Sequence, residues 1–223
     1  CNSRMKKKNF LIIGLGRFGS MVAKTLELLK CDVLAVDNDE DIVSSISNYV
    51  SHCVIADSTK LNVLVDLNAA SFDHAVVAIG NNLQASILTV LNLKKLGVKN
   101  ITVRADNEDF KEVFENLGVT EVIIPEEVSA ISLANQITSN SILDYYYISD
   151  DYGIYKVSVG ENFTSKSLIE LDVRNTFDVN IVGIIRDDLF YIPKGTDVLN
   201  ALDVVVVVGK KNKIKKFDSF LNA

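Results

Sequence analysis

The chain has 223 residues and a net charge of −6, so it is long enough for one large domain or two modest ones but lacks the basic excess of a general nucleic-acid binder. Although 48% of its residues are hydrophobic, no stretch approaches the roughly 20 uninterrupted apolar residues of a membrane-spanning helix. Its three cysteines form neither a CxxC pair nor a disulfide framework. We expect a cytoplasmic protein that starts at Met5 and meets a membrane only through a partner.

The first 125 residues alternate short apolar runs with helical patterns. Apolar runs that predict buried parallel strands lie at residues 10–13, 33–36, 53–55, 75–79, 101–103 and 121–124. Helical patterns separate them at residues 18–29, 41–49, 60–68, 82–96 and 108–117. This alternation predicts an α/β fold with a Rossmann-type, doubly wound parallel sheet.

The pattern of predicted secondary structure changes after Pro125. Residues 126–140 indicate a helix that leaves the sheet, with Glu126 and Glu127 in its first turn. Short, hairpin-like strands follow at residues 145–148, 154–159, 181–186, 189–192 and 204–208. We therefore expect a Rossmann domain over residues 5–125, a crossover helix within 126–143, and a small α+β lobe over 144–223.

The most specific motif is Gly14-Leu15-Gly16-Arg17-Phe18-Gly19, which follows a buried strand and opens a helix. Glycines at these positions allow a tight turn and let the backbone approach a diphosphate, while the helix N-terminus supplies N–H donors and partial positive charge. Asp37 lies 18 residues after Gly19, at the end of the second strand, where it is placed to bind a ribose 2′-hydroxyl. The same carboxylate would repel a 2′-phosphate, so NADP is disfavoured.

Other loops are expected at the same edge, because ligands of such sheets bind beyond the carboxyl ends of the strands. Asn38 extends the end of the second strand, and Asp57 and Ser58 follow the third, placed to flank an adenine. The end of the fourth strand is placed to pass under the phosphates, and it comprises Ala78, Ile79, Gly80 and Asn81. An ordinary helix cap explains Ser58 equally well.

Three charged residues favour a phosphate-rich ligand. Arg17 lies within the glycine loop, and Arg104 ends the fifth strand. Glu126 follows the sixth strand, where it would pair with Arg17 or supply an oxygen ligand to Mg²⁺ or Ca²⁺. The alternative is that Glu126 only complements the N-terminus of its own helix.

Catalytic groups are not evident. The two histidines, His52 and His74, precede strands and so belong to the edge opposite the expected ligand. No Ser/His/Asp order, metal-binding Cys/His spacing or P-loop lysine motif occurs. We predict no catalytic residue and no enzymatic activity.

Several separated motifs together resemble the RCK family (regulator of K⁺ conductance), the KtrA/TrkA-type regulatory subunits of bacterial potassium uptake systems. They are the glycine loop, Ala35-Val36-Asp37, Ala78-Ile79-Gly80-Asn81 with Gln84-Ala85-Ser86, and Pro125-Glu126. The later lobe, with Ser165-Lys166-Ser167-Leu168 and Leu171-Asp172-Val173-Arg174, is similar to the TrkA-C lobe of that family.

The resemblance implies homodimers that assemble into an octameric ring beneath a membrane K⁺-translocating subunit of the KtrB/TrkH type. It implies that ATP, ADP or NAD(H) occupies the N-terminal crevice, with Arg17 near the γ-phosphate, and that nucleotide exchange switches the ring. A divalent cation is implied at the dimer interface beside Glu126. Cyclic di-AMP is implied at the dimer interface of the second lobe, with Arg174, Ile181 and Pro193 as candidates.

Asp57 would add negative charge near the ligand, and Arg104 stands where a lysine would also serve, so phosphate preference is open. Two other interpretations remain. The chain could be a small NAD-dependent oxidoreductase, or a nucleotide or redox sensor with a partner other than a channel.

Overall fold

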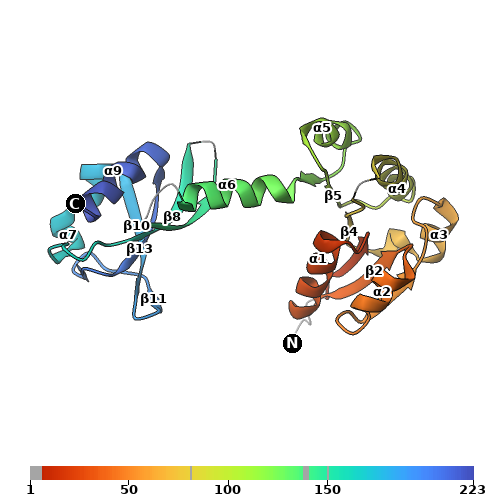
Figure 1. The fold of residues 1–223 in the computed structure, drawn as a ribbon, viewed down its shortest axis with the longest axis horizontal. Coiled ribbons are helices and arrows are strands. Elements are labelled where there is room, and N and C mark those ends of the chain that lie inside the picture. Colours follow the sequence, from red (N-terminus) through yellow and green to blue (C-terminus); the bar gives the residue numbers. More distant parts are fainter. Residues whose placement is uncertain (1–6, 81, 138–140, 150) are drawn as a thin grey trace, which may run out of the picture. The chain divides into compact units, whose positions relative to one another are not determined.

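The computed structural model describes residues 7–80, 82–137, 141–149 and 151–223. They form two compact units, Cys1–Pro125 and Glu126–Ala223. In Figure 1 the first unit runs from red to yellow-green and the second from green to blue.

The first unit is built on a six-stranded parallel sheet with the order β3-β2-β1-β4-β5-β6. Its strands are β1 (Asn9–Ile13), β2 (Asp32–Asp37), β3 (His52–Ile55), β4 (His74–Val77), β5 (Ile101–Arg104) and β6 (Glu121–Ile123). The direction of strand addition reverses between β1 and β4, which creates a crevice at the carboxyl ends of these strands. The predicted doubly wound Rossmann-type sheet is confirmed.

Helices connect these strands and begin at side-chain caps where the sequence supplies them. They are α1 (Arg17–Leu28), α2 (Glu40–Ile46), α3 (Leu61–Asp66), α4 (Leu83–Lys95) and α5 (Glu108–Asn116), with a short 3₁₀ turn, η1, at Ala69–Ser71. Asp39, Asn82 and Asn107 accept backbone N–H groups at the starts of α2, α4 and α5. Past the ends of α4 and α5, Gly97 and Gly118 adopt positive φ.

Both faces of this sheet are covered. Leu11 and Ile13 of β1 point into one core, with Leu64 of α3, Val90 of α4 and Phe114 of α5. Ile12 points the other way and packs with Ala23 of α1, Val43 and Ile46 of α2, and Val33 and Ala35 of β2. Since both faces are buried, the strand ends are the part of the sheet left open to a ligand.

The second unit contains a five-stranded antiparallel sheet with the order β11-β10-β13-β8-β7, and a two-stranded pair, β12-β9. Its strands are β7 (Ile142–Tyr147), β8 (Tyr152–Ser158), β9 (Lys166–Ser167), β10 (Val179–Arg186), β11 (Leu189–Tyr191), β12 (Val198–Leu199) and β13 (Val204–Lys210). Its helices are α6 (Pro125–Ile137, beginning at the boundary), α7 (Leu168–Leu171), α8 (Val173–Phe177) and α9 (Lys211–Leu221).

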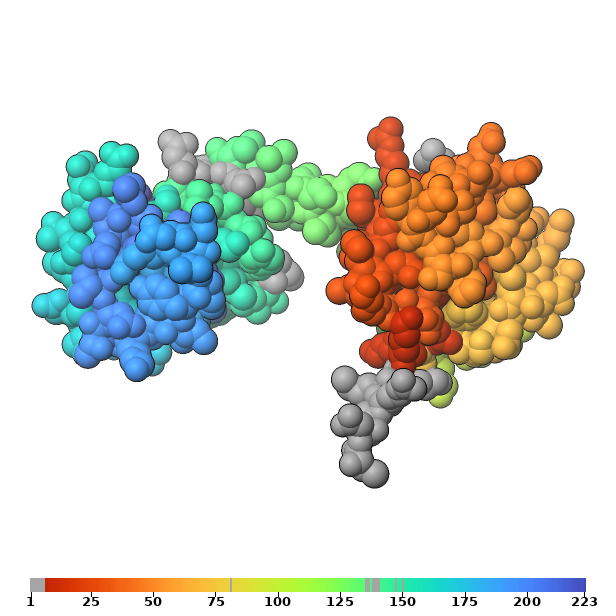
Figure 2. Space-filling view, turned by 90° about the horizontal axis from the view of Figure 1, so that it is seen from below, coloured from red at the N-terminus to blue at the C-terminus, as the bar shows by residue number. Residues whose placement is uncertain are grey.

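Alternation along β13 builds the second core. Val205 and Val207 are fully buried, whereas Val204, Val206 and Val208 are only half-buried. Ile214, Phe217 and Leu221 of α9 pack onto the same core. The space-filling view shows the cyan and blue residues of this unit packed against one another (Figure 2).

The structure also differs from the sequence expectations. The fourth strand ends at Val77 rather than Ile79, and α6 begins at Pro125, while residues 138–140 of the expected helix lie outside the described residues. The elements α7, α8, β9 and β12 were not expected. They are two to five residues long, too short to show periodicity, and they depend on local bonds such as the reciprocal Ser167–Glu170 capping box. In the part of the chain that the structure describes, no helix has the length and apolar character to cross a membrane.

Candidate nucleotide-binding crevice

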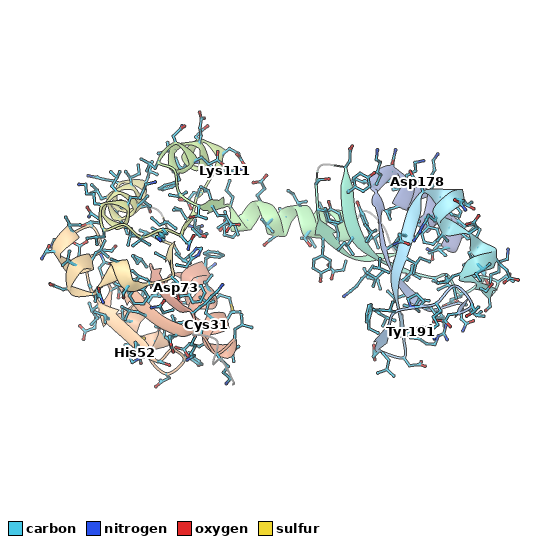
Figure 3. The ribbon with its side chains drawn as sticks, turned by 180° about the vertical axis from the view of Figure 1, so that it is seen from behind. Cys31, His52, Asp73, Lys111, Asp178 and Tyr191 are labelled. Carbon is cyan, nitrogen blue, oxygen red and sulfur yellow. The ribbon has the colours of Figure 1, made fainter. Side chains whose placement is uncertain are left out.

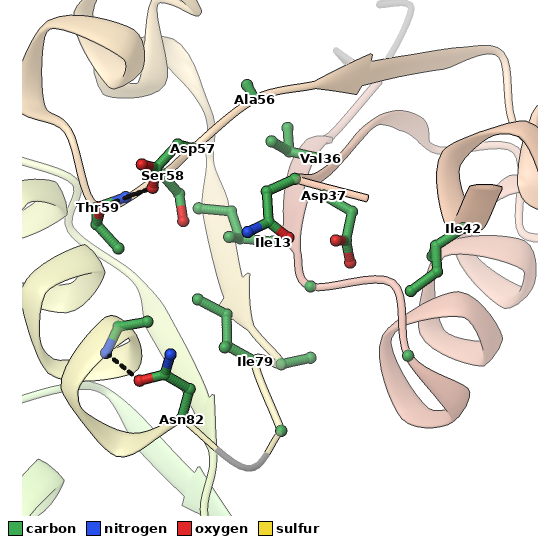
Figure 4. A pocket seen from close by; sticks show the side chains of 16 residues that line it. Ile13, Val36, Asp37, Ile42, Ala56, Asp57, Ser58, Thr59, Ile79 and Asn82 are labelled. Carbon is green, nitrogen blue, oxygen red and sulfur yellow. Dashed lines mark hydrogen bonds between the residues drawn. The ribbon is translucent and has the colours of Figure 1, made fainter. Parts of the chain in front are cut away.

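A cavity of about 400 Å³ lies at the carboxyl ends of β1, β2, β3 and β4. Figure 4 shows Asp57, Ser58 and Thr59 on one side of it, Asp37 and Ile42 on the other, and Ile79 and Asn82 below them in this view. Nine of the predicted site residues line it: Gly14, Gly16, Asp37, Asn38, Asp57, Ser58, Ala78, Ile79 and Gly80. The switch point of the sheet thus brings together residues that are far apart in the sequence.

Glycine is needed at the three positions of the loop for different structural reasons. Gly14 has φ +90°, and a Cβ there would lie 2.7 Å from the Ala78 carbonyl carbon. A Cβ on Gly19 would lie 1.8 Å from the Gly14 carbonyl oxygen, so α1 could not pack on the loop. Around Gly16, in contrast, a Cβ would meet no protein atom within 4 Å, and this glycine lines the cavity. Gly14 and Gly19 are required by packing, whereas Gly16 leaves room for a ligand.

The N-terminus of α1 offers a partial positive charge to the cavity. Its N-cap is Gly16, no side chain caps it, and its first turn carries no acidic residue. Arg17 is the exposed first residue of this helix, and within the described part of the chain its side chain has neither an ion pair nor a hydrogen bond. The guanidinium of Arg17 can therefore turn toward an anion without breaking an existing contact.

Asp37 joins the glycine loop to β2. Its Oδ2 accepts a hydrogen bond from the Leu15 backbone N–H at 2.6 Å, and its Oδ1 accepts one from the Asp39 N–H at 3.1 Å. A carboxylate has about four acceptor positions, so lone pairs remain for the hydroxyl groups of a ribose. Asp37 can thus shape the loop and bind ligand at once.

Asp57 is tied into a local turn. Its Oδ1 accepts the Thr59 hydroxyl at 2.6 Å and the Thr59 N–H at 3.1 Å, while the Lys60 ammonium lies 3.4 Å from Oδ2. These contacts, the Thr59 hydroxyl first, lower the pKa of Asp57 and keep it ionised. The charge that Asp57 adds beside the cavity is partly balanced by Lys60.

The remaining candidates lie outside the lining. Phe18 is half-buried on α1 and Gly19 is buried beneath the loop. Arg104 forms an ion pair with Asp106 at 2.7 Å, and its Nη1 would lie 3.1 Å from a Cβ placed on Gly80. Asn81 falls outside the described residues, and Glu126 is an exposed residue of α6 in the second unit.

The lining also contains three residues that the sequence motifs did not single out: Ile13, Ile42 and Thr59. Val36 and Ala85, which belong to the motifs that carry the resemblance, line it too. Most are apolar ends of strands or inward-facing residues of helices, so their pattern indicates core packing rather than a ligand. Ala56 and Asn82 also line the cavity, within loops that were expected there.

Both histidines lie away from this cavity, as expected. His52 and His74 are the first residues of β3 and β4, and Figure 3 labels His52. The His74 Nε2 bonds the Thr102 hydroxyl at 2.8 Å, and burial lowers the pKa of His74. Among the described residues, no three His, Cys, Asp or Glu side chains gather as a metal site.

In the second unit, the candidates for a second messenger occupy separate elements. Arg174 is exposed on α8 and donates from Nη2 to Asn180 Oδ1 at 2.9 Å. Ile181 lies half-buried on β10, next to a break in the β10–β13 register, and Pro193 follows β11.

The fold and crevice define a class: a Rossmann-type domain with an open crevice at its strand ends, followed by an antiparallel α+β lobe. Comparison with known proteins agrees with this class, since residues 10–125 match the TrkA-N domain and residues 154–222 match the TrkA-C domain. The chain belongs to the TrkA-N/TrkA-C family that includes the Ktr system potassium uptake proteins.

Relatives cover nearly the whole chain. Ktr system potassium uptake protein C of Bacillus subtilis (strain 168) is 39% identical over 95% of this chain and 96% of its own length. Ktr system potassium uptake protein A of the same organism is 37% identical over 97% and 98%. The Vibrio alginolyticus protein A is 30% identical over 93% and 94%.

Solved structures share the fold at lower identity. The GsuK RCK domain matches with a TM-score of 0.65 and 15% identity, covering 100% of this chain and 49% of that one. The GsuK channel bound to NAD matches with a TM-score of 0.67 and 15% identity, covering 99% and 40%. This chain thus spans half or less of those longer chains, and the likeness concerns the fold.

Proposed function

We propose that this chain is a cytoplasmic regulatory subunit that senses an adenine nucleotide and controls a membrane potassium transporter of the Ktr type, without catalysing a reaction. The observation that carries the proposal is the crevice, in which the open space at Gly16, the uncapped start of α1 and the Asp37 carboxylate meet. Full-length relatives named as potassium uptake proteins supply the process to be regulated.

The charges around the crevice favour ATP or ADP, with NAD(H) as a further ligand. The start of α1 and Arg17 together attract terminal phosphates, and Arg17 would approach the γ-phosphate. Arg104 lies beside Gly80, so its guanidinium would be close enough to bind a phosphate that lies at the loop after β4. Asp37 disfavours the 2′-phosphate of NADP. NAD(H) remains in the proposal because a channel of the same fold is described as bound to NAD.

Assembly of the chain into a ring would let nucleotide binding control the membrane transporter. We place a homodimer contact on the crossover helix α6, where Val128, Leu133 and Ile137 are at least 56% exposed. Such dimers would form an octameric ring beneath a membrane K⁺-translocating subunit of the KtrB/TrkH type. A nucleotide that binds one ring state better than another shifts the ring toward that state by the difference in affinity.

Two further ligands belong to this proposal. A Mg²⁺ or Ca²⁺ ion would use Glu126 at the dimer contact, since carboxylate oxygens are the ligands that these ions prefer. Cyclic di-AMP would bind a dimer of the second unit near Arg174, Ile181 and Pro193. The Arg174 side chain is exposed there, so its guanidinium could bind a phosphate of the ligand.

The test combines binding with transport. Calorimetry of the whole chain should show binding of ATP, ADP and NADH and much weaker binding of NADPH. Arg17→Ala should weaken ATP more than ADP, by about tenfold for a lost charge-assisted contact. Lys216→Ala, which removes an exposed cation from α9 in the other unit, is the matched control and should change neither affinity.

Co-expression with a K⁺-translocating subunit should give a complex with ATP-responsive K⁺ flux. Nucleotide binding without any such complex would favour a sensor with another partner. Hydride transfer from NADH to a substrate would instead favour an oxidoreductase.

A further inference from the structure

Helix α4 carries a polar stripe that is unusual for a helix packed on a sheet. Ser86, Thr89 and Asn92 are spaced three residues apart, so they follow one another along one side of the helix. Their exposed fractions are 3%, 0% and 8%. Buried positions of this kind normally carry aliphatic side chains, because a buried hydroxyl or amide is costly unless it is hydrogen-bonded.

Each member of this stripe bonds a residue that lines the crevice. Thr89 Oγ1 and Ser58 Oγ are 2.9 Å apart, and Asn92 Nδ2 donates to the Thr59 carbonyl at 2.9 Å. Ser86 Oγ donates to the Ile79 carbonyl at 3.1 Å. Ser58, Thr59 and Ile79 all belong to the cavity lining, in the loops after β3 and β4 (Figure 4).

One helix therefore holds two loops of the crevice. Asn82 caps α4 by accepting the Ala85 N–H at 3.0 Å, and both of these residues line the cavity as well. Aliphatic side chains could fill the space under these loops, but they could not fix the positions of Ser58 and of the Thr59 and Ile79 carbonyls. The hydrogen bonds fix these polar groups in place, and a preorganised binding site needs such fixed groups.

We infer that Ser86, Thr89 and Asn92 are positioning residues that hold the crevice in its ligand-ready shape. Thr89 and Asn92 fix the wall at Ser58 and Thr59, and Ser86 fixes the loop at Ile79. The inference rests on the proposed function, in which phosphates lie at the glycine loop and ribose at Asp37. The adenine then faces Ser58 and Thr59, so Thr89 and Asn92 govern recognition of the base.

The test uses near-isosteric variants of the whole chain. Thr89→Val removes one hydroxyl and keeps the shape, and Asn92→Leu does the same for the amide. Calorimetry should show ATP binding weakened about tenfold in each, with a reduced preference for ATP over GTP. Ser86→Ala should weaken both nucleotides to the same extent. Thr89→Ser, which keeps the hydroxyl, should keep the ATP affinity and the preference for ATP over GTP of the wild type.

Thr25→Val is the matched control, because it removes a helical threonine hydroxyl that donates to the Met21 carbonyl of its own helix, away from the cavity lining. It should leave ATP affinity unchanged. Thermal unfolding without ligand distinguishes a role in positioning the crevice loops from a role in stability alone. A merely structural role would lower the Tm of Thr89→Val and leave its ATP affinity and base preference intact. That result, or wild-type preference in both Thr89→Val and Asn92→Leu, would overturn the inference alone. A wild-type chain that binds no nucleotide would overturn the proposed function along with it.

Discussion

The two units bury their apolar residues by different means and leave different surfaces open. The parallel sheet of the first unit is covered on both faces, so its open region is the strand ends, where glycines remove side chains and polar loops gather. In the second unit, α9 packs onto the alternate buried valines of β13, and the buried Asp203 carboxylate binds Arg186. Gly14, Gly16 and Gly80 line the open crevice of the first unit, whereas buried side chains fill the core of the second unit.

The largest expected effect is a glycine substitution in the first unit. Gly19→Ala would place a Cβ 1.8 Å from the Gly14 carbonyl oxygen, a backbone atom that cannot move cheaply. We expect a loss of about 3 kcal/mol in the free energy of unfolding. Denaturant unfolding followed by a probe in the first unit would measure it.

Gly16→Ala is the matched substitution. Its Cβ meets no protein atom within 4 Å, so the free energy of unfolding should change by less than about 0.5 kcal/mol, while ATP affinity should fall about tenfold. If Gly16→Ala proved the more destabilising of the two, the division between packing glycines and a ligand glycine would be wrong.

The second prediction concerns the buried carboxylate of the second unit. Asp203 is 2% exposed and accepts bonds from Arg186 Nε at 2.8 Å, Arg186 Nη2 at 2.7 Å and the Asn200 N–H at 2.8 Å. Asp203→Asn should cost about 2 kcal/mol of stability, which is less than the roughly 3–5 kcal/mol for breaking a fully buried pair, because the Arg186 side chain is 37% exposed and can turn to water.

Asp178→Asn is the control, since Asp178 is exposed and pairs with Lys213 at 3.7 Å. It should cost less than about 0.5 kcal/mol. Both variants should bind ATP as the wild type does. A lowered ATP affinity in Asp203→Asn would show that the two units are coupled more strongly than we expect.

Alkaline pH should weaken the second unit. Burial, and then the neighbouring Tyr145, raise the pKa of Tyr155 to about 12. Folding favours the neutral phenol, so this stabilisation is complete below pH 10 and is lost as the pH rises toward 12, amounting to about 2 kcal/mol. Unfolding free energies at pH 9 and 11.5 would measure the loss, and Tyr155→Phe should reduce it. An unchanged pH dependence in that variant would exclude Tyr155 as the cause.

A smaller effect of opposite sign is expected in the first unit at acid pH. Burial lowers the pKa of His74, so folding favours the neutral imidazole. This contribution is present above pH 6.5 and is lost as the pH falls through the lowered value in the folded state. The His74→Gln variant should lose less stability than the wild type between pH 7 and pH 5, as followed by thermal unfolding. An identical loss in both proteins would assign the acid sensitivity to other groups.

The sequence predicted the fold of the first unit better than that of the second, for a physical reason. Gly14, Gly16 and Gly19 occupy positions where a Cβ is either blocked or would fill the crevice, so the residue type itself reports the geometry. By contrast, α7 and α8 form through local caps and the left-handed Asp172 and Asp178, which leave no periodic signal.

Within the site, the sequence predicted which residues lie at the strand ends, but it did not predict where their side chains point. The parallel topology alone places Asp37, Ser58 and Gly80 at one edge. Where Arg104 points depends on its ion pair with Asp106, a contact that spacing does not reveal. Ile42 lines the cavity from α2, yet in the sequence it is one of many apolar helix residues.

The central claim is that the crevice of the first unit binds an adenine nucleotide, and a crystal structure of the chain grown with ATP and Mg²⁺ tests it most directly. We predict density for the phosphates at Gly16 and the start of α1, for the ribose at Asp37, and for the adenine against Ser58 and Thr59. An empty crevice at saturating ATP, or nucleotide bound only elsewhere on the chain, would contradict the account.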